Sequence, residues 1–220
     1  MKILAVIALG LWMFYSPLLP ASETEDADEA WLNDDSEFQS LDVNEGELKF
    51  IAPIKNKAVL FSDTELMITE DSLKTGWVNM QQCYHNLDPV GQLDIVYQYK
   101  NIKKLDIISS QGIEKAVLSG QRVSLKNLTS PAILCVKALV QNLSKAEKGF
   151  VLTNGPYHRQ FLDGYYPYHI RLRIDYPSHK LALIHFLPQQ QALFNPQHTD
   201  GRFIIDTWFE GNLIIKLEFE

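Results

Sequence analysis

Residues 154–167 gather the side chains in this sequence that are best suited to chemistry. The candidate residues are Tyr157, His158, Arg159, Asp163, Tyr165 and Tyr166. Glycine and proline stand on both sides of the cluster, which indicates a structured loop between strands. Because loops held by a rigid β scaffold often carry binding residues, we take these six residues as the candidate ligand-binding site.

Each residue type in this loop offers a different contact. His158 would exchange a proton near neutral pH, and Arg159 has a planar fork that suits a carboxylate or phosphate. The tyrosines would stack on a sugar ring or pack on a partner protein. A structural role is the alternative, in which Arg159 pairs with Asp163, Asp163 with Gly164 forms a turn, and the tyrosine rings enter the core.

Other polar residues outside 154–167 give only weak support for a binding site. His85 would join His158 if the fold brought the two together, which sequence alone does not decide. His169, Arg171 and Arg173 form a small cationic stripe on a predicted strand. One interpretation is that the stripe binds an anionic ligand or the acidic segment of this chain. The alternative is a solvated face whose charges discourage strand edges from pairing.

Motifs for known catalytic and metal sites are missing from the sequence. It has no Gly-x-Ser-x-Gly elbow, no phosphate-binding glycine loop and no His-Glu-x-x-His. No carboxylate pair stands out as the acid and base of sugar hydrolysis. We therefore expect no catalytic residue, no metal and no cofactor.

The N-terminus has the pattern of a secretory signal peptide over residues 1–21. Lys2 precedes an apolar run over residues 3–19, and a small-residue boundary ends at Ala21. This pattern predicts a periplasmic or secreted protein. The run is nearly long enough to span a bilayer, so an uncleaved membrane anchor is the alternative.

Residues 22–47 form an acidic segment that we expect to be disordered. From residue 22 to residue 48 the chain has eleven acidic residues and no Lys or Arg, so it repels itself and buries little surface. The whole chain has 20 basic and 27 acidic residues; without Lys2 and those eleven acids, 19 and 16 remain, about +3 for residues 49–220. This excess is too small to indicate a nucleic-acid partner.

Residues 48–220 show the two-residue period of β-strands. In 168–176, apolar residues alternate with His, Arg and Asp, and in 213–219 Leu213, Ile215, Leu217 and Phe219 would face inward. Residues 203–209 and 213–219 flank a short glycine-containing loop, which predicts a hairpin. The other candidate strands are 48–52, 58–61, 65–69, 76–84, 92–99, 104–109, 115–118, 122–125, 132–142 and 181–187.

Many short strands at this spacing predict an all-β fold, an antiparallel β-sandwich with little helix. Only residues 139–147 would form a helical turn or two. The polar stretch 144–149 marks a boundary if the domain is instead two small sandwiches in tandem. One continuous core is favoured, because a C-terminal piece of about 70 residues would be marginal alone.

Cys83 and Cys135 are the only two cysteines. In an oxidising compartment such a pair usually forms one structural disulfide, and no C-x-x-C spacing favours a redox-active site. The sequence therefore predicts a Cys83–Cys135 bridge between two strands.

These observations favour a non-enzymatic exported protein that binds or scaffolds a partner in the cell envelope through residues 154–167. The partner would be an envelope protein or glycan, and contact with a membrane is expected only if the N-terminal segment is retained. The alternatives are a hydrolase of envelope glycans or peptides, with His158 and Asp163 as acid and base, and a carbohydrate-binding module that uses the tyrosines.

Overall fold

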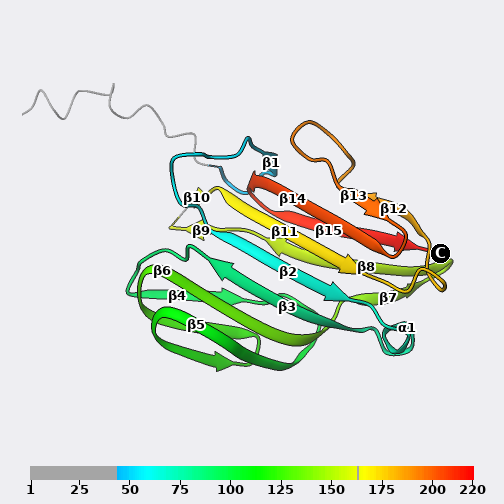
Figure 1. Cartoon of the computed structure of the whole chain (residues 1–220), viewed down its shortest axis with the longest axis horizontal. Helices are drawn as coiled ribbons and strands as arrows, with labels where there is room; N and C mark the ends of the chain where they lie inside the picture. The colour runs from blue at the N-terminus through cyan, green and yellow to red at the C-terminus, as the bar shows by residue number, and fades with distance from the viewer. Residues whose placement is uncertain (1–43, 163) are drawn as a thin grey trace, which may run out of the picture. The chain divides into compact units, whose positions relative to one another are not determined.

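The computed structural model describes residues 44–162 and 164–220, where nearly every regular element is a β-strand. Two sheets pack face to face (Figure 1). Tyr176, next to a strand of the larger sheet, and Phe219 of the smaller sheet have ring centroids 5.0 Å apart. Phe186 and Phe203 make a second contact between the sheets at 5.5 Å. The predicted all-β, sandwich-like fold is confirmed.

The larger sheet has nine strands. Its main path runs β1-β14-β11-β2-β3-β6-β4, with β13 on β14 and β5 on β6. The bounds are β1 (Lys49–Phe50), β2 (Phe61–Met67), β3 (Trp77–His85), β4 (Gln92–Val96), β5 (Ile102–Ser119), β6 (Arg122–Gln141), β11 (Tyr168–Asp175), β13 (Gln197–Thr199) and β14 (Arg202–Glu210). Neighbouring strands are antiparallel except β2 and β11, which run parallel.

The smaller sheet has four strands in the order β12-β15-β8-β7. Their bounds are β7 (Leu143–Ala146), β8 (Gly149–Tyr157), β12 (Leu183–Leu187) and β15 (Leu213–Phe219). Two further short strands, β9 (Gln160–Phe161) and β10 (Gly164–Tyr165), pair with each other. This small pair lies in the 154–167 segment that the sequence singles out.

The alternation seen in the sequence sets the core. In β11 the even-numbered residues from Tyr168 to Ile174 are buried, and the odd-numbered ones are half-buried on the outer face. In β15 the four residues expected to face inward are all buried. The core is continuous across residues 144–149, because Leu143 and Leu152 belong to the same buried cluster.

The predicted hairpin of residues 203–209 and 213–219 is wrong. β14 belongs to the larger sheet and β15 to the smaller one, so the short loop between them turns a corner. Each strand has one apolar face, and placing the strands in facing sheets lets both faces share one core. Gly211 at this corner has φ +83°, and a Cβ there would lie 2.0 Å from the Glu47 carbonyl oxygen.

The single helix among the described residues is α1 (Glu70–Thr75). Thr69 caps its N-terminus, with its side chain accepting from the Ser72 backbone N–H, and Gly76 ends it in the left-handed conformation. The helical turns expected at residues 139–147 are absent. That segment instead forms the end of β6 and strand β7, because its apolar residues meet β3 and β8.

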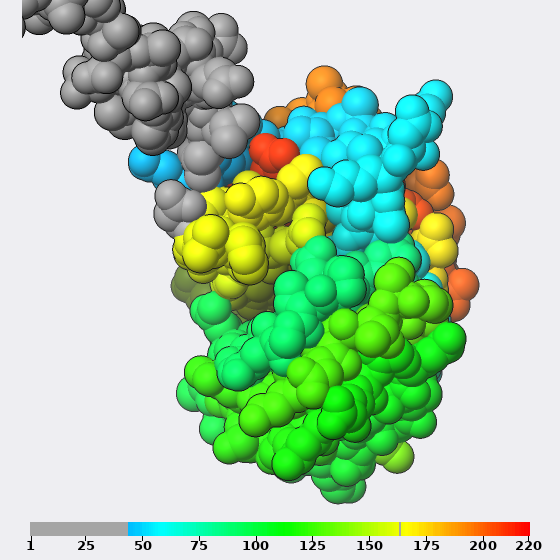
Figure 2. All heavy atoms as spheres, turned by 90° about the vertical axis from the view of Figure 1, so that its left-hand side faces the viewer, coloured from blue at the N-terminus to red at the C-terminus, as the bar shows by residue number. Residues whose placement is uncertain are grey.

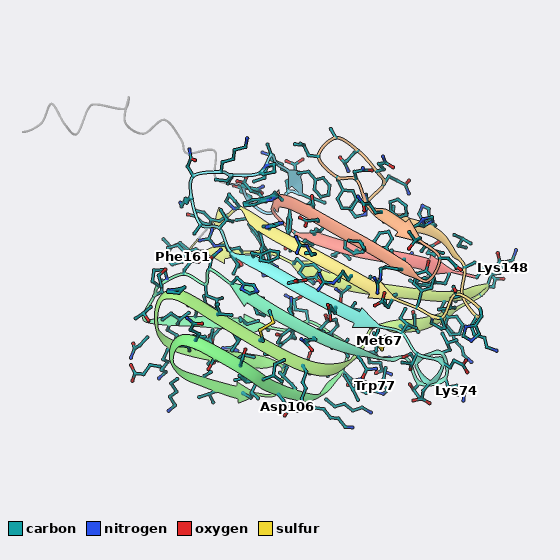
Figure 3. The ribbon with its side chains drawn as sticks, in the orientation of Figure 1. Met67, Lys74, Trp77, Asp106, Lys148 and Phe161 are labelled. Atoms are coloured by element: carbon teal, nitrogen blue, oxygen red, sulfur yellow. A yellow bond between two sulfur atoms is a disulfide. The ribbon has the colours of Figure 1, made fainter. Side chains whose placement is uncertain are left out.

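The disulfide predicted between Cys83 and Cys135 is confirmed. The two residues are direct partners in the antiparallel register of β3 and β6, with Cα atoms 4.0 Å apart. Figure 3 shows the bond in yellow between these strands. The bridge is compatible with an oxidising compartment outside the cytoplasm.

Strand β6 bends, and this bend shapes the interior. The first part of β6 pairs with β4 and its last part pairs with β3, while β5 follows the opposite edge throughout. Asn127 between the two parts has φ +52°, and the β5–β6 register shifts at three places. These irregularities bend a strand pair. The bend carries β4 and the loop after it over the inner face of β3.

The predicted signal peptide, residues 1–21, lies outside the described residues, as does most of the predicted acidic segment. The last residues of that segment, 44–47, contact the sheets. Asn44 is buried, its carbonyl accepts from the Tyr165 backbone N–H, and Gly46 accepts from Asn212. The described fold therefore already includes residues before the predicted domain start at 48.

Candidate functional site

A cavity of about 410 Å³ lies between β3, β4 with the loop after it, and residues 155–161. We call it the tyrosine cavity, because five tyrosines from four segments line it. They are Tyr84 of β3, Tyr97 and Tyr99 of the loop after β4, Tyr157 of β8 and Tyr168 of β11. Four glutamines also line it, whereas its apolar residues come mainly from β4 and the segment before it. The cavity thus combines aromatic surface with uncharged polar groups.

Side-chain hydrogen bonds hold two of these tyrosines in place. The Tyr84 hydroxyl donates to Gln82 Oε1 at 2.9 Å and lies 3.4 Å from the Tyr97 hydroxyl. The Tyr99 hydroxyl donates to Asn154 Oδ1 at 2.8 Å. The walls are therefore held by side-chain bonds as well as by the sheets.

The cavity tyrosines are neutral phenols at physiological pH. Burial raises the pKa of Tyr97 to about 12, although its bond with Tyr84 acts in the opposite direction. Burial also raises the pKa values of the other four above the usual 10. Each hydroxyl keeps its proton and can still accept a hydrogen bond, so the walls favour an uncharged, hydrogen-bonding ligand.

Residues 158–161 form the mouth of the cavity together with Asp88. Arg159 donates from Nε and Nη2 to the two Asp88 carboxylate oxygens at 3.1 and 2.6 Å. In Figure 2 the yellow surface of the β8–β11 region adjoins the green surface of the β3–β4 region at this end. Phe161, labelled in Figure 3, is 58% exposed and lines the opening.

His158 is the one ionisable group at the mouth that lacks an ionic partner among the described residues. Its ring is partly buried and packs edge-on against Tyr165 at 5.8 Å between centroids. Burial lowers the pKa of His158 below its usual 6.5, so the ring is neutral at pH 7. Its Nδ1 atom is buried without a hydrogen-bond partner.

The fold brings together half of the six predicted site residues. Tyr157, His158 and Arg159 line the cavity. Tyr165 and Tyr166 pack beside it, Tyr165 on His158 and Tyr166 against Phe161 at 6.4 Å. Asp163 lies outside the described residues.

His85 does not join His158. It lies on the outer face of the larger sheet, where its ring stacks on Phe61 at 5.4 Å. Phe61 in turn stacks on His169, and His169 on Trp208, each at 4.5 Å. These four rings form a row across β3, β2, β11 and β14 on the side of the sheet away from the cavity.

The predicted cationic stripe is neutralised by acidic side chains of the neighbouring strands. The pairs are His169–Asp206, Arg171–Asp206, Arg173–Asp63 and Arg173–Glu65. Because every member of the stripe meets a carboxylate, this face is not an open site for an anion.

The sequence analysis did not single out most of the residues that line the tyrosine cavity. Those missed include Gln82, Tyr84, Tyr97, Tyr99 and Tyr168. Strand alternation does place Tyr84 and Tyr168 on inward faces, and that signal was available. No local sequence pattern indicates that the loop after β4 returns across β3.

Comparison with known proteins gives no guide to function. No family model, curated protein or solved structure matches this chain. Within residues 44–162 and 164–220, no three His, Cys, Asp or Glu side chains come together as a metal site requires. In the same residues, no helix is long and apolar enough to cross a membrane.

Proposed function

We propose that this protein is a non-enzymatic, periplasmic or secreted binding protein, and that its ligand is a carbohydrate held in the tyrosine cavity. The observation that carries the proposal is the cavity lining of five neutral tyrosines and four glutamines. Sugars combine apolar C–H faces with many hydroxyls, so they match walls that offer aromatic rings and uncharged donors and acceptors.

The size of the cavity supports a small ligand or the end of a longer one. Its volume of about 410 Å³ falls at the lower end of the ~300–1,000 Å³ found for small-molecule sites. Phe161 extends the aromatic surface outward at the mouth, where a further sugar unit would lie. An envelope glycan is therefore a suitable partner.

The carboxylates at the cavity favour binding over hydrolysis. Within residues 44–162 and 164–220, Asp88 and Asp94 are the only acidic residues that line it. Each forms an ion pair, Asp88 with Arg159 and Asp94 with Arg122. Glycoside hydrolysis usually requires two carboxyl groups that are free to act as acid and base, whereas each of these two is held by an arginine.

The experiment is a glycan-array screen of the purified protein, followed by calorimetry on the glycans that bind. Tyr84→Phe and Tyr97→Phe each remove one hydroxyl from the cavity. We expect each to weaken binding by about five- to tenfold, since a hydrogen bond contributes about 1 kcal/mol. Tyr176→Phe is the matched control, because Tyr176 bonds to the Thr199 carbonyl and does not line the cavity.

Three results would contradict the proposal in whole or in part. Absence of binding to every glycan on the array would remove the carbohydrate assignment. Equal affinities for the wild type and both cavity variants would place the ligand elsewhere. Release of shorter sugars during incubation would show a hydrolase and overturn the non-enzymatic part.

A further inference from the structure

A second cavity of about 440 Å³ lies beside the first and has a different charge. We call it the lysine cavity. Three lysines from separate segments line it: Lys74 of α1, Lys100 of the loop after β4 and Lys145 of β7. Of the described residues that line this cavity, none is Asp or Glu.

The three lysines also lack ion-pair partners within the described part of the chain. No Asp or Glu oxygen of residues 44–162 and 164–220 comes within 4.0 Å of their ammonium groups. All five arginines are paired, including Arg159 at the mouth of the tyrosine cavity. Glu70 on the same helix interacts electrostatically with Lys74, but Glu70 does not line the cavity. Because the described residues of the lining include no carboxylate, the three lysines create a positive potential, which attracts an anion.

One hydrogen-bonded wall separates the two cavities. Gln98, Tyr99 and Gly155 line both. Within this wall, Asn154 Oδ1 accepts from the Tyr99 hydroxyl at 2.8 Å and from Asn142 Nδ2 at 3.4 Å. A ligand that reaches past these residues would contact both the tyrosine cavity and the lysine cavity.

Asn142 adds an unsatisfied acceptor to the lysine cavity. It lines the cavity, and its Oδ1 atom is buried without a hydrogen-bond partner. A buried polar atom without a partner costs free energy, and a hydroxyl donor from a ligand would satisfy it. The lysine cavity therefore offers sites for both an anionic group and a hydroxyl.

From these observations we infer that the lysine cavity binds the anionic group of an acidic carbohydrate whose uncharged part occupies the tyrosine cavity. This inference rests on the proposed function and narrows its ligand class. The anionic group is a carboxylate, as in a uronic acid, or a phosphate. Both accept hydrogen bonds from ammonium groups.

The test uses an array that carries the same sugar backbones in neutral, carboxylate and phosphate forms. We expect the wild type to bind one acidic form about tenfold more tightly than its neutral counterpart, because the anion is attracted by three ammonium groups. The triple variant Lys74→Gln, Lys100→Gln, Lys145→Gln should bind both forms with the affinity of the neutral one.

A second triple variant provides the control. Lys55→Gln, Lys57→Gln, Lys126→Gln removes the same charge from exposed lysines that line neither cavity, and it should keep the preference for the acidic form. All six lysines are exposed, so neither triple variant disturbs the core. Comparing the two variants separates a local site from a general effect of net charge.

The outcomes distinguish the two proposals. If the wild type binds neutral and acidic forms equally, the inference is wrong and the carbohydrate site stands. If the acidic preference survives in the lysine-cavity variant, the anion binds elsewhere and the inference is also wrong. If no glycan of any form binds, the proposed function fails and the inference fails with it.

Discussion

The hydroxyl of Tyr84 lies 3.4 Å from the hydroxyl of Tyr97, so strand β3 and the loop after β4 meet across the tyrosine cavity. The contact joins residues that the sheet register keeps apart, because β3 and β4 pair with different parts of β6. It forms only because β6 bends. The cavity is therefore a product of the bend, and its chemistry comes from whichever side chains the bend brings together.

The ionisation of the tyrosines gives the first prediction. The raised pKa values of the five cavity tyrosines should keep them protonated at pH 10, where an exposed tyrosine is half ionised. The ultraviolet absorbance of tyrosinate should therefore rise in two stages during a pH titration. A single step near pH 10 with the fold intact would contradict the buried network.

The same groups predict how stability changes with pH. Their folded pKa values exceed those of the unfolded chain, so their contribution is complete below pH 10 and is lost as the pH rises toward about 12, the folded value of Tyr97. Guanidinium unfolding at increasing pH measures this loss. A free energy of unfolding that stays constant across this range would show that the phenols are solvated.

The Arg159–Asp88 pair at the cavity mouth provides another prediction. A double-mutant cycle with Arg159→Gln and Asp88→Asn should give a coupling energy of about 1 kcal/mol, since the contact is bidentate and Arg159 is largely buried. Arg122–Asp94 is the comparison pair, with one contact at 3.3 Å and a more exposed arginine. Its coupling should be about 0.5 kcal/mol or less. Equal coupling in both cycles would mean that the mouth is not held by this ion pair.

Gly155 lines both cavities, and a single methyl group added there should lower the free energy of unfolding strongly. It has φ +115°, and a Cβ there would lie 2.6 Å from the Leu213 carbonyl oxygen. Gly155→Ala should cost about 3 kcal/mol of unfolding free energy, because it adds a steric clash to backbone strain. Gly120→Ala is the control, with φ +59° and open space around the added atom, and it should cost only about 1 kcal/mol. Equal losses of unfolding free energy in the two variants would mean that the residues around Gly155 move to accommodate the added methyl group.

Removal of the disulfide should lower the free energy of unfolding by a large amount. The disulfide closes a loop with a sequence separation of 52, and a chain-entropy treatment gives about 4 kcal/mol for such a bridge. The double variant Cys83→Ser, Cys135→Ser should lose about this much in urea unfolding without reductant. The wild type with reductant should approach the same midpoint, while the variant should not respond to reductant. An unchanged midpoint in the variant would contradict a stabilising bridge.

Local patterns in the sequence were sufficient to predict the disulfide and most of the longer strands, but they missed β8, which lies in no predicted strand. Period-two alternation in β11 and β15 reflects the need of each strand to bury one face, which is a property of neighbouring residues. The disulfide was predicted from an even number of cysteines and an expected oxidising compartment. Residues 154–167 were predicted to be a loop from their turn residues, but residues 154–157 form the end of β8. His158 and Arg159, which follow β8, lie at the mouth of the tyrosine cavity.

Long-range geometry explains what the sequence analysis missed. At the bend of β6 the register against β5 shifts, and the two strands approach so closely that a Cβ at Gly112 would lie 2.3 Å from the Pro131 carbonyl oxygen. No local pattern reveals such a contact. For the same reason, the corner at Gly211 was taken for a hairpin, since the two connections have similar residues and lengths.

Binding in the tyrosine cavity is the central claim, and the most direct measurement is nuclear magnetic resonance of the protein with isotope-labelled tyrosine rings. A glycan selected by the array would be titrated into the labelled protein. The account predicts that the ring signals of Tyr84, Tyr97 and Tyr99 shift while those of Tyr176 stay in place. Shifts confined to Tyr166 and Tyr176, with the cavity tyrosines unchanged, would contradict it.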